Sequence, residues 1–132
     1  YVNGVPVCWR TRAQKSVALS STEAEWYALS ECAKDMLFVL QLCADGIGIE
    51  VELPMTVYMD NIGAVFLSDN VQVNDRTKHI DIRSKFVREL VMEDGALKVV
   101  FVRSEQNDSD MLTKNLQSEL HQRHSQKLVC RK

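Results

Sequence analysis

Apolar residues recur at helical spacing along one long segment, from Ser20 to Gly46. Ser20 and Glu23 have the spacing of a capping box, which satisfies backbone amides at the start of a helix, and Gly46 is expected to end that helix. At about 100° per residue, one line of side chains should face the core. The members of this line are Glu25, Leu29, Cys32, Met36, Leu40 and Cys43.

Glu25 is the unexpected member of this line, because burying an unpaired carboxylate is costly. Glu23 should point about 160° away around the same helix, and it already has a capping role. Two explanations for Glu25 stay open. Either it lies at the frayed edge of the helix and reaches water, or it has a chemical task.

Three further segments have the composition of β-strands: residues 5–11, 55–59 and 96–102. Asn3 and Gly4 stand between apolar residues and predict a hairpin turn, close to the end of a strand whose body is missing from the chain. Residues 96–102 are almost continuously apolar, which is typical of a parallel strand buried on both faces.

Asp60 follows the strand at 55–59 and precedes a short expected helix that begins at Ile62. In open α/β sheets, ligands gather at the carboxyl ends of the strands. The alternative is that Asp60 or Asn61 caps the following helix. Both explanations can hold for neighbouring residues.

A second amphipathic helix is expected from about Thr77 to Glu93. Its core side should carry Ile82, Phe86 and Leu90, and its outer side Asp81, Lys85 and Arg88. A third helical start follows the strand at 96–102, with Asn107 or Asp108 as its cap and Asp110 in its first turn. Asp110 suits the dipole of that helix for stability alone. His121 and His124, in the tail, are expected to be exposed.

Basic residues in two places could contact a phosphate backbone. They are Arg10, Arg12 and Lys15 before the long helix, and Arg76, Lys78 and His79 near the start of the second helix. Solvated surface charge is the competing explanation for both sets. His79 extends the core side of its helix, and a histidine there is more often packed than a base or a ligand.

Composition narrows the class of protein. The chain has 132 residues, of which 45% are hydrophobic and 26% charged, with a formal net charge of −2. These are values of a single soluble globular domain, and they exclude a disordered tail and a coiled coil. No apolar run reaches the roughly 18 residues of a membrane span, and no signal peptide is evident, so we expect an intracellular protein with four reduced cysteines.

Glu25, Asp60 and Asp110 come from three separate elements: a helix start, a strand end and a helix's first turn. Such a set of carboxylates can hold Mg²⁺, which prefers oxygen ligands. Pairs of such ions perform phosphodiester hydrolysis in nucleases. From spacing alone, this metal site is one interpretation among several.

Four strings occur in the order SSTEAEWYALSECAKD, VYMDNIGAV, RTKHIDIRSKFVRE and DSDMLTK. Together they resemble the ribonuclease H domain at the end of copia-type retrotransposon polyproteins. The resemblance extends from the Asn3–Gly4 turn to about Leu116 and so covers nearly the whole chain.

The resemblance implies a ribonuclease H-like α/β fold, a mixed sheet flanked by helices. It also implies hydrolysis of the RNA strand of RNA/DNA hybrids with Mg²⁺, or Mn²⁺ in its place, as cofactor. Matched motif by motif, the family's catalytic and metal-binding carboxylates fall on Glu25, Asp60 and Asp110. The implied partners are the hybrid and the upstream reverse transcriptase region of the same polyprotein, in the cytoplasm, a virus-like particle or the nucleus, without a membrane.

The family's first catalytic aspartate lies on the first strand of the sheet, upstream of the Asn3–Gly4 turn. By that comparison the chain lacks the first strand, most of the second, and one of four carboxylates. We therefore expect residues 1–117 to form an N-terminally incomplete ribonuclease H-like domain, followed by a basic tail at 118–132 that can form a helix. The fragment alone should cleave little or nothing.

The competing hypothesis is binding without catalysis, by a remnant or host-adopted copy that holds hybrid or scaffolds a polymerase domain. Intact Glu25, Asp60 and Asp110 favour the enzyme mildly, because drift would be free to change them. An integrase or resolvase of the DDE type fits the carboxylates but not the TKHID and LTK strings.

Overall fold

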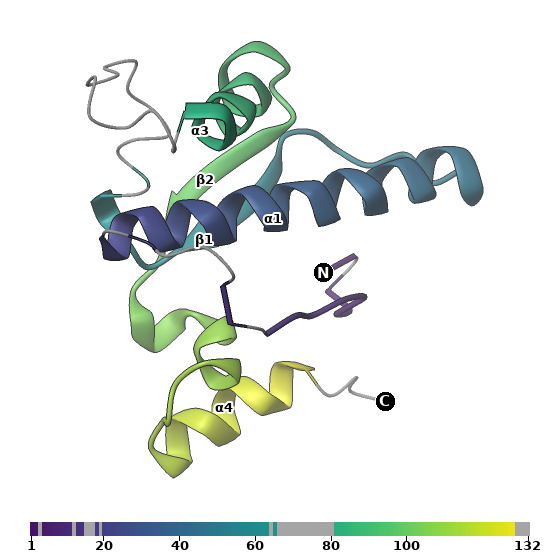
Figure 1. The fold of residues 1–132 in the computed structure, drawn as a ribbon. Helices are drawn as coiled ribbons and strands as arrows, with labels where there is room; N and C mark the ends of the chain where they lie inside the picture. The colour runs from purple at the N-terminus through teal and green to yellow at the C-terminus, as the bar shows by residue number, and fades with distance from the viewer. Residues whose placement is uncertain are drawn as a thin grey trace. The chain divides into compact units, whose positions relative to one another are not determined.

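The computed structural model describes residues 1–2, 4–11, 13–14, 18, 20–63, 65 and 81–128. They belong to two compact units, one of residues 16–101 and one that joins residues 1–15 with 102–132. The elements in chain order are α1 (Ser21–Gln41), η1 (Leu42–Gly46), β1 (Met55–Met59), α3 (Asp81–Arg88), η3 (Glu89–Glu93), β2 (Leu97–Phe101), η4 (Ser104–Gln106), η5 (Asp108–Leu112) and α4 (Ser118–Leu128) (Figure 1).

The unit of residues 16–101 is built on a parallel pair of strands. β1 and β2 run side by side in the register Met55 to Leu97 through Met59 to Phe101. This confirms the two predicted strands and the prediction that the second of them is parallel; its pairing with β1 is a finding of the structure. After β1 the chain turns into the expected helix, whose described residues are Ile62, Gly63 and Val65, and the Val65 amide donates to the Asn61 carbonyl at 3.1 Å. Residues 64 and 66–68 of the expected helix lie outside the described residues.

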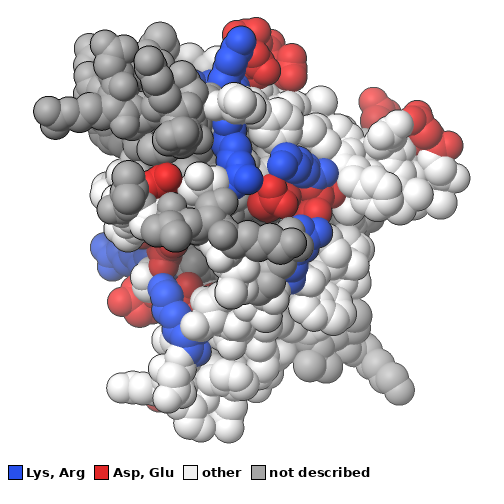
Figure 2. All heavy atoms as spheres, in the orientation of Figure 1, with Lys and Arg blue, Asp and Glu red and all other residues white. Residues whose placement is uncertain are grey.

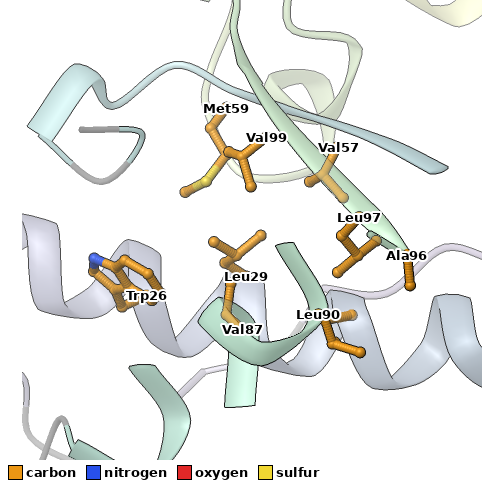
Figure 3. Packing of buried hydrophobic residues seen from close by; sticks show 10 residues of the cluster. Trp26, Leu29, Val57, Met59, Val87, Leu90, Ala96, Leu97 and Val99 are labelled. Atoms are coloured by element: carbon orange, nitrogen blue, oxygen red, sulfur yellow. The ribbon is translucent and has the colours of Figure 1, made fainter. Parts of the chain in front are cut away.

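One face of the sheet carries the core. Alternate strand residues, Val57 and Met59 of β1 and Leu97 and Val99 of β2, point toward Leu29 of α1 (Figure 3). The cluster is completed by Trp26 and Ala33 of α1, Val87 of α3, Leu90 of η3, and Ala96. Removing this apolar surface from water is the main stabilising contribution of the unit.

The predicted burial of residues 96–102 on both faces is wrong. Lys98 is exposed between the buried Leu97 and Val99, and Tyr58 of β1 is 63% exposed between Val57 and Met59. The reason is that the core residues of α1, α3 and η3 all pack on the same face of the strand pair. The strands therefore show the alternation of a sheet covered on one side.

Helix α1 begins as predicted and faces the core differently. Ser20 caps it, its side chain accepting the Glu23 amide at 3.1 Å. The buried stripe runs through Trp26, Leu29, Ser30 and Ala33, so it is rotated from the predicted line, of which Leu29 and Cys43 are buried as predicted. Trp26 has the largest apolar side chain in the first turns of α1. The observed orientation of the helix buries it and so removes more apolar surface from water than the predicted orientation would.

Two members of the predicted line are corrected by this rotation. Cys32 is exposed, and Glu25 is half-buried beside the stripe, whereas Glu23 is 6% exposed at its head. Gly46 ends η1, as expected of the helical segment, but the positive φ of 64° belongs to Gly48. Gly48 is thus the left-handed residue that follows the helical segment.

Helix α3 also differs from its predicted orientation. Ile82 is 84% exposed, and the buried side chains of α3 are Ser84 and Val87. Leu90, in η3, is buried as predicted, and Phe86 is half-buried against the core. Arg88, predicted on the outside, is half-buried, with Lys85 exposed as expected. The guanidinium of Arg83 lies 4.1 Å above the ring of Tyr27, which ties α3 to α1.

At the chain start, the predicted turn is present and the predicted strand is not. Val2 and Val5 exchange two backbone hydrogen bonds, of 2.9 and 3.0 Å, around Gly4, whose φ is 76°. Residues 6–11 adopt no regular secondary structure. A strand needs a neighbour for its backbone groups, and among the described residues only this short bridge pairs with the segment.

Candidate metal and nucleic-acid site

Asp60 stands directly after the carboxyl end of β1, as predicted. The segment that follows it lies against the first turn of α1, because a Cβ atom added at Gly63 would be 3.4 Å from Oγ1 of Thr22. Glu25 follows Thr22 by three residues and so lies on the same side of that helix. The structure thus brings the strand end that carries Asp60 to the helix turn that precedes Glu25, both within one unit.

Asp110 belongs to the other unit, where it is buried in η5 with 4% of its surface exposed. Its Oδ1 accepts a hydrogen bond from the Asn107 amide at 3.1 Å, and its Oδ2 accepts one from the Lys114 ammonium at 2.7 Å. Burying an ionised carboxylate is costly unless it is paired in this way. The Asp110 carboxylate is therefore held in a fixed orientation.

Asn107 supports this arrangement with both ends of its side chain. Its Oδ1 accepts the Ser109 amide at 3.2 Å and so caps η5, as predicted for Asn107 or Asp108. Its Nδ2 is the donor to Asp110. One short turn of chain therefore fixes the carboxylate without help from the rest of the fold.

A second polar cluster in the same unit surrounds Asp108. Its Oδ1 lies 2.6 Å from Nδ1 of His124 and 2.8 Å from Nζ of Lys127. His124 is fully buried, which corrects the prediction that it is exposed; His121 is exposed as expected. Partial burial and the Asp108 carboxylate raise the pKa of the Tyr1 hydroxyl, and Lys127 opposes them.

The sequence held a signal for one of the residues missed at this site. Lys114 stands four residues after Asp110, the spacing at which an acid and a base meet on a helical turn. The His124 contact crosses sixteen residues and a turn, with no local pattern to predict it. Burial of this histidine follows from tertiary packing alone.

The three candidate carboxylates are thus divided between the units, Glu25 and Asp60 in one and Asp110 in the other. Within the described part of the chain, no three His, Cys, Asp or Glu side chains gather as a metal-binding group. The roles of Glu25, Asp60 and Asp110 as metal ligands and catalytic residues stay predictions.

Most of the predicted nucleic-acid contacts lie outside the described residues: Arg12, Lys15, Arg76, Lys78 and His79. Arg10 is described and exposed. On the face shown in Figure 2, the Lys and Arg side chains of the described residues lie close to Asp and Glu side chains. One ion pair of the described residues joins Lys34 to Glu31 at 2.8 Å. That face shows no broad field of one sign among those residues.

Among the described residues, no helix is long and apolar enough to cross a bilayer. The described cysteines, Cys8, Cys32 and Cys43, are free thiols, as expected; Cys130 lies outside the described residues.

No protein-family model matches the chain, and no solved structure matches it. Three long polyproteins do. The chain is 39% identical, over 85% of its length, to the retrovirus-related Pol polyprotein from transposon TNT 1-94 of Nicotiana tabacum. Over 97% of its length, it is 34% and 35% identical to the corresponding polyproteins from transposons RE2 and RE1 of Arabidopsis thaliana.

These relatives are far longer than the chain, which spans 8% of the first and 9% of each of the others. The predicted family resemblance is confirmed at the level of the polyprotein. The chain is a homologue of one segment of the Pol polyproteins of copia-type transposons and belongs to that family.

Proposed function

We propose that this segment is the ribonuclease H part of its polyprotein and hydrolyses the RNA strand of RNA/DNA hybrids. The observation that carries the proposal is the approach of the Asp60 strand end to the first turn of α1, which precedes Glu25. In α/β sheets, ligands bind at the carboxyl ends of the parallel strands, so carboxylates there are placed to contact them. The similarity to Pol polyproteins over nearly the whole chain supports it at a coarser level.

The donor set fits a hard divalent cation. Glu25, Asp60 and Asp110 offer carboxylate oxygens, the ligands that Mg²⁺ prefers, and Asn107 and Lys114 hold the Asp110 carboxylate in place. When bound, Mg²⁺ or Mn²⁺ would activate water and stabilise charge on the phosphate. A fourth carboxylate would come from polyprotein residues outside these 132.

The protein's own part is to orient these oxygens and to hold the hybrid. Hybrid recognition would depend on duplex shape and on the 2′-hydroxyl groups rather than on base sequence. Arg10 and the basic residues near it are the proposed phosphate contacts on the N-terminal side. The partners proposed are the hybrid and the reverse transcriptase region of the same polyprotein.

The test uses an extended chain, these 132 residues expressed together with the coding sequence immediately upstream. With Mg²⁺ and a hybrid whose RNA strand is labelled, the extended chain should cut RNA, and Asp60→Asn should abolish cutting while hybrid binding persists. Asp94→Asn is the matched control, because the exposed Asp94 precedes β2 and so lies at the opposite end of the parallel strands from Asp60. Equal cutting by the Asp60 variant would refute the proposal.

One observation favours the alternative of a non-catalytic scaffold. Both oxygens of Asp110 are engaged by Asn107 and Lys114, as expected of an aspartate with a structural role. The scaffold explanation stands if the extended chain binds hybrid but does not cut the RNA, and if the carboxylate variants behave in the same way. Loss of cutting in the Asp60 variant with binding retained supports the enzyme.

A further inference from the structure

We propose that Lys114 is a positioning residue, a resident counter-ion of Asp110 that a divalent cation must displace; this inference rests on the proposed function. Its Nζ atom lies 2.7 Å from Oδ2 of Asp110. The Asp110 side chain is 6% exposed and that of Lys114 is 49% exposed. The carboxylate is therefore buried, while about half of the lysine side chain already faces solvent.

The remaining contacts keep Asp110 in place when the ammonium leaves. Asn107 holds Oδ1, and the backbone amides of Thr113 and Lys114 donate to the Asp110 carbonyl at 3.1 and 2.7 Å. The turn that carries the carboxylate is thus fixed by groups other than the Lys114 side chain. Oδ2 is the oxygen that becomes available to an ion when Lys114 moves away.

Electrostatics determine the direction of the effect. An ammonium on Oδ2 stabilises the carboxylate in the absence of metal, and it repels a dication that approaches the same oxygen. A divalent cation and the lysine ammonium, about 5 Å apart in water, repel each other enough to weaken metal binding by about tenfold. Removing the lysine charge should therefore tighten metal binding by about that factor, less at high salt.

The chain offers a matched control for this lysine. Lys127 is exposed to the same degree, 51%, and its Nζ lies 2.8 Å from a carboxylate oxygen of the same unit, that of Asp108. Asp108 is not among the proposed ligands. Removing the Lys127 charge therefore changes an equivalent ion pair without changing the proposed metal site.

The experiment measures Mn²⁺ binding to the extended chain by electron paramagnetic resonance, without nucleic acid. Lys114→Met should bind Mn²⁺ about tenfold more tightly than the unaltered chain. Lys114→Arg, which keeps the charge, and Lys127→Met should stay within twofold (~0.4 kcal/mol) of it. Unchanged or weaker binding by a folded Lys114→Met overturns the inference, and loss of binding in Asp110→Asn shows that the site is the one intended.

Two further results keep the outcomes distinct. If the unaltered extended chain binds no Mn²⁺, both the proposed function and this inference fail; if it binds through Asp110 and Lys114→Met changes nothing, the inference fails alone. Should Lys114→Met lose its helical circular dichroism, the unaltered chain is titrated with Mg²⁺ by NMR. The Lys114 ammonium resonance should then shift and that of Lys127 should not, and an unmoved Lys114 resonance overturns the inference.

Discussion

Replacing Asp108 with Ala should destabilise the unit of residues 1–15 and 102–132 by about 2 kcal/mol. Asp108 joins η5 to α4, because its carboxylate meets the imidazole of His124 at 2.6 Å and the ammonium of Lys127 at 2.8 Å. The substitution removes both contacts at once. The two contacts differ in burial, and this difference determines how much each contributes to the stability of the unit.

The His124 contact should account for most of the loss. The imidazole is fully buried, and its Nε2 is already without a hydrogen-bond partner among the described residues. Leaving Nδ1 unpaired as well costs about 1–3 kcal/mol. The half-exposed Lys127 pair contributes about 0–1 kcal/mol, because solvent screens it and the long side chain loses freedom when it is held.

Hydrogen exchange of the α4 amides is the measurement that isolates this unit. A loss of about 2 kcal/mol should lower their protection about 30-fold. Lys127→Met, which removes the exposed contact alone, should lower it less than fivefold (~1 kcal/mol). Equal losses in the two variants would refute the reasoning, because they would show that the buried histidine is not the energetic partner of Asp108.

Three further predictions concern the other unit and are read from urea unfolding. Ser20→Ala should cost about 1 kcal/mol, because the Glu23 amide at the start of α1 loses its acceptor; no change would show that the cap is not formed. Leu97→Ala should cost about 2–5 kcal/mol, because Leu97 is 2% exposed in the core, and a loss below 1 kcal/mol would contradict that burial. Val87→Ser should cost more than about 2 kcal/mol and Ile82→Ser less than about 0.5 kcal/mol, and the reverse order would restore the orientation predicted for α3 from the sequence.

Local chemistry was predictable where a residue acts on its immediate neighbours. The caps at Ser20 and Asn107, the turn at Gly4 and the strand that leads into Asp60 all depend on contacts within about four residues. The parallel character of β2 was predicted from its nearly continuous apolar run, although that run is buried on one face only.

Orientation was less predictable, because it depends on which element packs against which. In α1, the lines through Glu25 and through Trp26 are both apolar over several turns, and the tertiary fold buries the one with the indole. In α3, the exposed Ile82 shows the same ambiguity. The packing of His124 on Asp108 joins residues sixteen apart, which no periodicity predicts.

The most direct test of the proposed activity compares two glutamates two residues apart. The family resemblance assigns the catalytic role to Glu25, which is half-buried, whereas the structure buries Glu23 at the head of the core stripe. In the extended chain, cleavage of the labelled RNA strand of a hybrid should be lost in Glu25→Gln and retained in a folded Glu23→Gln. Retained cleavage in Glu25→Gln, or no Mg²⁺-dependent cleavage by the unaltered extended chain, would contradict the account.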